Sequence, residues 1–357
     1  MILFTTLALS LLQIWGNWIS PIPSNASLYF AGDAMQHIAQ IESAHQADGS
    51  YSYSNCFTLV KEQISEANLA ICNLEVTLGG KPYRGYPQFS APDEFAIALK
   101  DAGFDIMLTA NNHCLDRGSK GLIRTLDILD SLGIAHVGTY RNQEERDSLY
   151  PYITTTNGIR CAILNYTYGT NGISVNPPCI VNYIDTTQIL KDINKARIKK
   201  ADVIIACMHW GNEYVYKPSE QQRYLAQLFV DNGADLIIGT HPHVLQPLEY
   251  ISKPDGSQVP CFYSLGNFTS SQTETPRMLG GMAKVTITKT EGENTVIETA
   301  IIQPTVTHIS SDCRYYTTYM LSNYTNELAS SHYLTRKGKN MTVEKLNELY
   351  NSICTNN

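Results

Sequence analysis

The sequence predicts an α/β domain, because short apolar runs alternate along the chain with longer segments of helical periodicity. Two of the runs share the form Ala-Asp-x-Ile-Ile and each ends in histidine, which indicates one βα unit used twice. No linker or low-complexity stretch divides the chain, so we expect one large domain with a C-terminal extension. The apolar runs, each expected to form a strand, are residues 27–33, 69–75, 104–113, 160–169, 201–211, 234–244 and 261–268.

Segments of helical periodicity separate these runs. The segment at 218–232 begins with Pro218 and Ser219 and is followed by Gly233, which are start and stop signals for a helix. Residues 282–306 alternate between apolar and polar side chains, which predicts an antiparallel hairpin at the edge of a sheet. The expected helices lie near residues 57–67, 93–102, 119–132, 186–199, 218–232 and 342–353.

The two ends of the chain differ from the α/β part, which we place at residues 25–308. Residues 1–23 contain an apolar run at 2–15 that is typical of a signal peptide, although no Lys or Arg precedes it. Retention of this segment as an N-terminal anchor is the alternative, and both interpretations predict an extracytoplasmic protein. Residues 309–357 are polar and rich in tyrosine, and we expect a partly helical extension there.

Charge and cysteine content exclude several classes of function. The net charge is −7 and no run is rich in Lys or Arg, which argues against nucleic acid as a partner. The nine cysteines fit neither a disulfide framework nor the spacing of a zinc site. Those at positions 72, 161, 207 and 261 lie inside apolar runs and are expected to be small buried side chains.

Polar side chains follow the apolar runs at the point where each run ends. Ligands of open α/β sheets bind outside the carboxyl ends of the strands, so these side chains are expected to meet at one edge. Oxygen and imidazole ligands without thiolates suit Zn²⁺, Mn²⁺ or Fe²⁺, and a carboxylate shared by two such ions describes a hydrolytic site. The positive charge left over would attract an anionic substrate to this acidic chain. The residues at these ends are Asp33, Asn73, Glu75, Asn111, Asn112, His113, His209, His241, His243 and Asn267.

Together these residues stand in motifs that resemble the CapA (PgsA-like) family, whose members are associated with capsule and poly-γ-glutamate synthesis. The resemblance covers roughly residues 27–305. CapA proteins are similar in turn to the calcineurin-like metallophosphoesterases, so the resemblance implies a metallophosphoesterase-like two-sheet sandwich flanked by helices. The motifs are Gly32-Asp33, Asn73-Leu74-Glu75, Asn111-Asn112-His113-x-x-Asp116-x-Gly118, His209-Trp210-Gly211-x-Glu213-Tyr214, Gly239-x-His241-Pro242-His243 and Ser264-Leu265-Gly266-Asn267-Phe268.

The resemblance implies a pair of metal sites with a bridging carboxylate. Asp33 and His243 would bind the first ion, and Glu75 would bridge the two ions where phosphoesterases use Asp. Because side chains alternate along a strand, His241 and His243 are expected to point the same way, so that one strand end serves both ions. The remaining expected ligands, all of the second ion, are Asn112, His209 and His241.

The first motif departs from the phosphoesterase pattern, which has Asp-x-His where this chain has Asp33-Ala34-Met35. The thioether of Met35 cannot replace an imidazole as a ligand of a hard divalent ion. Two outcomes are open: the first metal site is weaker, or His37 supplies the missing ligand.

His113 is the candidate general acid or donor to a substrate oxygen. It directly follows Asn112, and neighbours at a strand end are expected to point in opposite directions, so both are not expected to bind the same ion. Asp116 either orients His113 or caps the helix expected at 119–132, and the sequence does not decide between these roles.

Further polar residues near the motifs are candidates for contacts with substrate. Arg117 could clamp a phosphate or carboxylate, and Glu213 could hold a metal-bound imidazole. The loop at 82–89 holds Arg84 and Tyr86, which suit an anion but equally a simple turn. The substrate-side candidates are Arg117, Glu213, Asn267 and His37, and the histidines expected to be structural are His45, His136, His308 and His332.

Two functions fit these features. One is a metal-dependent hydrolase of a phosphoester, or of an amide in an extracellular polymer. The other is a weakly catalytic or non-catalytic assembly component that holds a polyanion on the same metal edge. The expected partners are an anionic small molecule or polymer and membrane-associated capsule machinery. A binding module without metal is a third interpretation, which metal analysis would separate from the first two.

Overall fold

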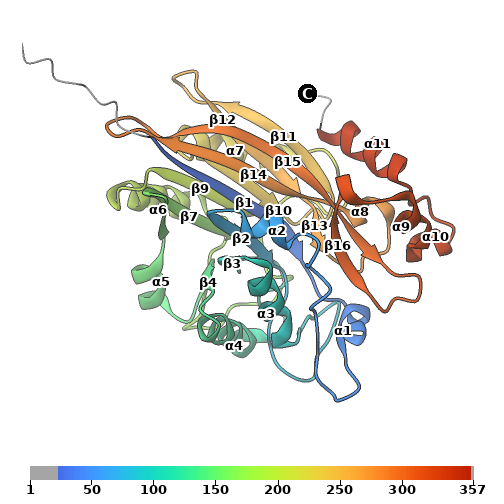
Figure 1. The fold of residues 1–357 in the computed structure, drawn as a ribbon. Helices are drawn as coiled ribbons and strands as arrows, with labels where there is room; N and C mark the ends of the chain where they lie inside the picture. The colour runs from blue at the N-terminus through green and yellow to red at the C-terminus, as the bar shows by residue number, and fades with distance from the viewer. Residues whose placement is uncertain (1–22, 355–357) are drawn as a thin grey trace, which may run out of the picture.

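Two β-sheets pack face to face in the computed structural model, which describes residues 23–354, and helices cover their outer faces (Figure 1). The predicted two-sheet α/β sandwich is therefore confirmed. The apolar run at 2–15, expected to be a signal peptide or anchor, lies outside the described residues. Between residues 23 and 354 no helix has both the length and the apolar character needed to cross a lipid bilayer.

The first sheet combines a parallel part with an antiparallel part. The strands before residue 138 pair in parallel, as does the short β13 with β1, and the antiparallel strands come from residues beyond 278. Its strands, in order, are β16 (Tyr316–Met320), β15 (Val296–Ile309), β14 (Leu279–Lys289), β1 (Ser24–Ala34), β2 (Leu69–Leu74), β3 (Ile106–Leu108) and β4 (Ala135–Val137), with β13 (Asn267–Thr269) beside the end of β1.

The second sheet is parallel in its centre and antiparallel at both edges. Its strands, in order, are β11 (Leu245–Ser252), β12 (Gln258–Leu265), β10 (Leu236–Thr240), β9 (Val203–His209), β7 (Ile159–Thr167) and β6 (Tyr152–Thr156). A small separate ribbon pairs β5 (Thr139–Tyr140) with β8 (Ile180–Val181).

The six predicted helices are present as α2, α3, α4, α6, α7 and α11, and five short helices, α1, α5, α8, α9 and α10, were not predicted. Ser219 caps α7 because its hydroxyl accepts a hydrogen bond from the Gln222 backbone, and the Gln222 side chain returns a bond to Ser219. The helices are α1 (Ile38–Ala44), α2 (Lys61–Ser65), α3 (Asp93–Ala102), α4 (Gly118–Ser131), α5 (Gln143–Leu149), α6 (Thr186–Ile198), α7 (Glu220–Asp231), α8 (Thr275–Met278), α9 (Asn326–Ser331), α10 (Tyr333–Arg336) and α11 (Val343–Cys354), with a 3₁₀ turn at Leu321–Asn323.

The hairpin predicted at 282–306 is present as β14 and β15, but it does not form the edge of its sheet. That position belongs to β16, which pairs with β15 and comes from the segment expected to be an extension. The prediction missed this strand because five residues of mixed character, Tyr316–Met320, carry too short a pattern to stand out.

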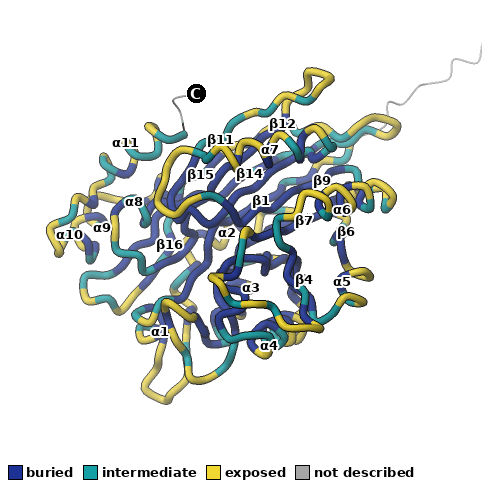
Figure 2. The backbone as a smooth tube through the Cα atoms, turned by 180° about the vertical axis from the view of Figure 1, so that it is seen from behind, coloured by how far each residue is buried: buried dark blue, intermediate teal, exposed yellow. Residues whose placement is uncertain are grey.

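The alternation of side chains along β1 divides the core into two layers. Leu28 and Phe30 belong to the apolar layer shared with the second sheet, whereas Tyr29 and Ala31 face the helices. Figure 2 shows the strands of both sheets as buried and the outer helices as partly exposed. The four cysteines predicted to be small core side chains, at positions 72, 161, 207 and 261, are buried and free.

The two sheets approach each other closely at the carboxyl end of β1. The Asp33 backbone N–H donates to the Gly266 carbonyl at 2.9 Å, just after β12 ends. A Cβ at Gly32 would lie 2.0 Å from that same carbonyl oxygen, so only glycine allows this approach. The strand ends of both sheets therefore meet at one edge, as the sequence predicted.

Candidate metal centre

The structure brings all six expected metal ligands together. Each is at most 3% exposed, which matters because a buried polar group without a partner is costly. Three come from the first sheet and three from the second, at or just after a strand end. The six are Asp33, Glu75, Asn112, His209, His241 and His243.

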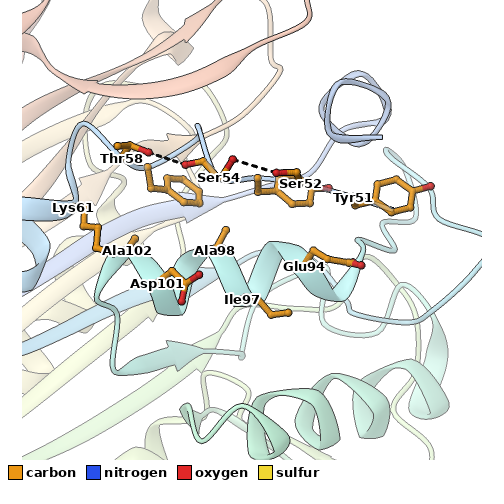
Figure 3. A pocket seen from close by; sticks show the side chains of 12 residues that line it. Tyr51, Ser52, Ser54, Thr58, Lys61, Glu94, Ile97, Ala98, Asp101 and Ala102 are labelled. Carbon is orange, nitrogen blue, oxygen red and sulfur yellow. Dashed lines mark hydrogen bonds between the residues drawn. The ribbon is translucent and has the colours of Figure 1, made fainter. Parts of the chain in front are cut away.

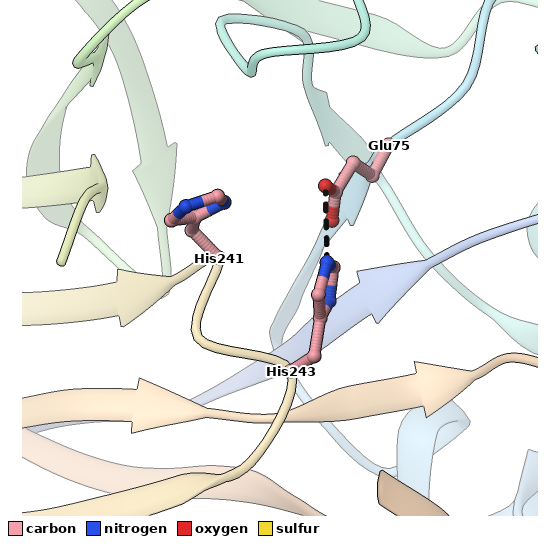
Figure 4. A group of neighbouring side chains, drawn as sticks. All are labelled: Glu75, His241 and His243. Carbon is pink, nitrogen blue, oxygen red and sulfur yellow. Dashed lines mark ion pairs between the residues drawn. The ribbon is translucent and has the colours of Figure 1, made fainter. Parts of the chain in front are cut away.

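Glu75 lies at the middle of this cluster. Its Oε1 is 3.6 Å from His209 Nε2 and 3.8 Å from His243 Nε2. Neither carboxylate oxygen accepts a hydrogen bond within the described chain, and His241 Nδ1 is also buried without a partner. Figure 4 shows the imidazoles of His241 and His243 on the side of their shared loop that faces the Glu75 carboxylate. Two sets of three ligand atoms lie within 4.8 Å of one another, and Glu75 belongs to both.

The unpartnered atoms fit a bound cation. Burial, together with the charge of Asp33, raises the pKa of Glu75 well above its ordinary value, so a nearby positive charge would stabilise its ionised form. Burial and the neighbouring His243 lower the pKa of His241 to about 3, and burial with His241 lowers the pKa of His209. These imidazoles are therefore neutral, which is the form that binds metal.

On one side of Glu75, Asp33 faces His243. The Asp33 Oδ2 atom is 3.2 Å from His243 Nδ1, and Asn73 donates to Asp33 Oδ1 at 2.7 Å. Burial opposes ionisation of Asp33, but the hydrogen bond and charge of His243 outweigh it and lower the pKa of this carboxyl. Asp33 is thus held as a carboxylate.

On the other side, His209 faces Asn112. The His209 Nε2 atom is 3.0 Å from Asn112 Oδ1, and its Nδ1 is 3.0 Å from the Thr240 hydroxyl and 3.3 Å from the Asn73 amide. Thr240 and Asn73 therefore orient this imidazole. The sequence makes Glu213 a candidate for that role. Glu213 is exposed, and its charge acts on Tyr214 instead, where burial and this charge raise the pKa of the hydroxyl.

His241 and His243 serve the same cluster for a different reason than strand alternation. β10 ends at Thr240, and the two histidines lie in the loop that follows with φ angles of 98° and 56°. Such positive φ values are rare for residues other than glycine and are often found at functional sites. The ring centroids are 5.8 Å apart, and the His241 backbone N–H donates to Asp33. The loop conformation, and not the period of a strand, directs both rings toward Glu75.

His113 pairs with Asp116 beside the cluster. The His113 Nδ1 atom is 2.7 Å from Asp116 Oδ2, which also accepts the Phe89 backbone N–H at 2.7 Å. Arg117, not Asp116, occupies the position before α4, so Asp116 orients the imidazole and does not cap the helix. Strand alternation is not what sets the directions of Asn112 and His113, because β3 ends at Leu108 and residues 111–113 lie in a turn.

Residues 27–272 match the model of a family described as Bacterial capsule synthesis protein PGA_cap. The chain belongs to this family. The resemblance to CapA proteins is thereby confirmed. The Capsule biosynthesis protein CapA of Bacillus anthracis is 36% identical over 189 residues, which are 51% of this chain and 44% of that protein. The PGA biosynthesis protein CapA of Bacillus subtilis (strain 168) is 35% identical over 182 residues, 50% of this chain and 46% of that protein.

The matched region of this PGA_cap chain thus spans about half the length of these curated relatives. In three dimensions the chain is similar to the NAD nucleotidase NadN of Haemophilus influenzae, with a TM-score of 0.50 and 16% identity over 92% of this chain and 60% of that one. The fold is therefore of the metallophosphoesterase type.

The first motif of this PGA_cap chain supplies no imidazole to the cluster. Met35 is buried in an apolar cluster with Phe89. His37 caps α1, accepts a hydrogen bond from the Ser271 backbone at 3.3 Å and packs edge-on against Phe89. It belongs to neither set of neighbouring ligand atoms, so its proposed replacement of the missing ligand has no support in the geometry.

Two substrate-side candidates have contacts that indicate positioning roles. The Asn267 Oδ1 atom is 3.0 Å from His243 Nδ1, and its amide N–H groups donate to Gln272 and to the Arg277 carbonyl. Asn267 is fully buried and orients His243. Arg117 is half-buried and its charge lies near Asp116.

Several residues at the site were missed by the sequence analysis. The Tyr168 ring lies 4.5 Å from the His241 ring, while the Tyr214 ring is 6.0 Å from the His243 ring. Tyr168 directly follows β7, so the rule that strand ends deliver site residues would have found it. Tyr214 stands in a quoted motif but was given no role.

A pocket elsewhere contains none of the site residues. It lies between α3 and the segment at 51–61, where Ser54 links Ser52 and Thr58 by hydrogen bonds (Figure 3). Its lining mixes single charges with apolar side chains, and nothing in it converges on a ligand atom. The strand-end cluster is the candidate functional site.

Proposed function

We propose that this chain is a metal-dependent phosphoester hydrolase of capsule or poly-γ-glutamate synthesis that holds two divalent ions. The observation that supports it most is the Glu75 carboxylate, buried between three imidazoles and Asp33 with both oxygens unpartnered. A carboxylate in that state is suited to bridging two cations. The PGA_cap family and the metallophosphoesterase fold agree with this role.

The residues divide between two ions around Glu75. We assign Asp33 and His243 to one ion, because their side chains contact each other. The oxygen and nitrogen donors, with no thiolate among them, suit Mn²⁺, Zn²⁺ or Fe²⁺. When bound, such ions supply the Lewis acidity that activates water and stabilises charge on a phosphoryl oxygen. The ligands assigned to the other ion are Asn112, His209 and His241.

His113 is positioned to handle the proton of the leaving group. Asp116 accepts from Nδ1 and so leaves Nε2 as the nitrogen available to a substrate oxygen. The Phe89 ring packs edge-on against His113 with centroids 4.6 Å apart, which fixes the imidazole plane. A positioned general acid contributes about 10²- to 10⁴-fold in rate.

The substrate that we infer is an anionic small molecule or polymer, and the working place is outside the cytoplasm with membrane-associated capsule machinery. Support comes from the printed names of the relatives, which concern capsule and PGA biosynthesis. A second function, holding a polyanion during assembly without rapid turnover, is favoured by one observation. Met35 takes the place of an imidazole, so the first ion has one ligand fewer than in phosphoesterases.

Screening of the metal-loaded chain separates these functions. The substrates are p-nitrophenyl phosphate, bis-p-nitrophenyl phosphate and a γ-glutamyl polymer, with Glu75→Gln as the inactive control. We expect turnover of a phosphoester by the wild type and none by the variant. Metal-dependent binding of the polymer without turnover of any substrate would favour the assembly role and contradict the hydrolase.

A further inference from the structure

Arg277 presents a free guanidinium next to the metal centre. Its guanidinium carbon lies 3.6 Å from the centroid of the Tyr214 ring, and in the described part of the chain that guanidinium makes no hydrogen bond or ion pair. The acidic residue near it in sequence, Glu274, pairs with Lys339 instead. Arg146, by contrast, forms an ion pair with the buried Asp192. The N–H donors of Arg277 are therefore available to a ligand.

Two connections hold Arg277 against the cluster. Its backbone carbonyl accepts a hydrogen bond from the Asn267 amide at 3.0 Å, and Asn267 Oδ1 is 3.0 Å from His243 Nδ1. From the other side, the Tyr214 backbone N–H donates at 2.8 Å to the carbonyl of Pro242, which lies between the two histidines. The segment that carries the guanidinium and the ring beneath it are thus both attached to the histidine loop.

The stacking on Tyr214 fixes the plane of the guanidinium. A planar guanidinium binds the two oxygens of a carboxylate or phosphate side by side, and preorganisation reduces the entropy lost on binding. Arg277 is only half-buried, so a ligand can reach it from solvent. Of the carboxylates in the cluster, Asp33 faces His243, and Glu75 is, on our proposal, held by cations.

Arg117, which the sequence analysis favoured as the anion clamp, is placed differently. Its side-chain stem is wedged between Gly79 and Gly121, where an added Cβ would lie 2.5 Å and 2.3 Å from it. Its charge acts on Asp116, the partner of His113. Arg117 therefore supports the acid pair, and among the described residues it lacks the stacked ring that fixes the plane of the Arg277 guanidinium.

We propose that Arg277, stacked on Tyr214, binds an oxyanion of the substrate beside the metal centre. This inference rests on the proposed function and deepens it, since it names the residue that selects anionic substrates. The oxyanion is either the phosphoryl group or a carboxylate of a glutamyl unit, and both use the same bidentate geometry.

Calorimetric titration of the manganese-loaded chain with inorganic phosphate, and separately with glutamate, tests the assignment. Arg277→Gln should weaken binding of the recognised anion by about 10- to 100-fold, and Arg277→Lys should weaken it less. The matched control is Arg223→Gln, because Arg223 pairs with Glu249 in an ion pair away from the cluster. Metal content and melting temperature should not change in any of the three variants. The anion whose affinity falls identifies the source of the oxyanion.

Equal binding of both anions by wild type and Arg277→Gln overturns the assignment and leaves the metal centre untouched. The assignment is also overturned if Arg117→Gln loses anion binding and Arg277→Gln does not. A folded wild type that binds no metal contradicts the proposed function instead. The anion titrations are then run on the metal-free chain. Weaker anion binding in Arg277→Gln alone supports the assignment. Anion binding that is absent in the wild type, or equal in the wild type and Arg277→Gln, overturns it.

Discussion

Two clusters of buried histidines lie within residues 23–354, and they differ in how their ring nitrogens are satisfied. In the C-terminal cluster, His308 Nδ1 is 2.8 Å from the Tyr324 hydroxyl, and His332 bonds the Thr307 carbonyl and the Leu334 backbone N–H. In the metal centre, His241 Nδ1 and both oxygens of Glu75 have no partner.

Burial alone therefore does not identify a functional histidine. Burial lowers the pKa of His308 and of His332 to about 4, much as it lowers the pKa of His241 to about 3. The clusters differ instead in their hydrogen-bond accounting, because only the metal centre leaves ligand atoms that a cation would satisfy. The predictions below test that distinction.

The largest effect is expected for Glu75→Gln. This change keeps the size of the side chain but removes the charge shared by both cation positions, so the chain should lose both ions and its turnover should fall to background. Elemental analysis of the purified variant measures the loss. Retention of one tightly bound ion would show that Glu75 is a terminal ligand of a single site.

His113 shares a feature with each of the two histidine clusters. Its ring has a hydrogen-bond partner, as in the C-terminal cluster, yet it lies beside the metal centre. His113→Ala should keep the metal content and the fold while turnover falls by about 10²- to 10⁴-fold. Steady-state kinetics on the phosphoester found by screening, with metal analysis in parallel, provide the check. A variant that loses an ion would make His113 a ligand, and one that keeps full activity would remove it from the reaction.

A matched pair of substitutions compares the clusters directly. His332→Ala removes two satisfied buried hydrogen bonds and should lower the free energy of unfolding by roughly 2–4 kcal/mol without loss of metal. His241→Ala removes an unsatisfied group, so the metal-free variant should stay within about 1 kcal/mol of wild type while its metal content falls. Urea unfolding of the metal-free proteins measures both, and the reverse pattern would refute the distinction.

The smallest effect concerns pH. His332 has a pKa of about 4 in the folded chain against an ordinary value of 6.5, so below pH 6.5 the unfolded chain binds a proton that the folded chain does not. Stability is therefore lost as the pH falls toward about 4. Without this group, His332→Gln should show a slope of unfolding free energy against pH that is shallower by up to about 1.4 kcal/mol per unit. Identical slopes would mean that the pKa of His332 is not lowered in the folded protein.

Much of the fold and the ligand set could be predicted from the sequence, because strand ends carry the chemistry of this fold. Alternating apolar runs located β1, β2, β9 and β10, and the polar residues at their ends are candidate metal ligands that the structure brings together. The strands β4, β5, β6, β8 and β16 escaped prediction, since two to five residues carry no readable period. The eight-residue edge strand β11 was also missed, because Pro247 interrupts its pattern.

The reasoning from strand alternation does not apply where the direction of a side chain depends on loop conformation. The positive φ angles of His241 and His243 cannot be read from strand alternation, and the turn at 111–113 obeys a different geometry from β3. Arg277 was invisible for another reason: it lies ten residues after Asn267 and reaches the centre only through tertiary contacts. Patterns along the chain predict where strands end, but they do not predict which loops fold over those strand ends.

The most direct test of the account is the metal content of the folded wild-type chain after loading with manganese or zinc and removal of free ions. The account predicts about two ions per chain, a loss of both in Glu75→Gln, and no loss in His332→Gln. A folded wild type with no bound ion above the level of Glu75→Gln would contradict it, because the unpartnered atoms around Glu75 would then have no cation to satisfy them.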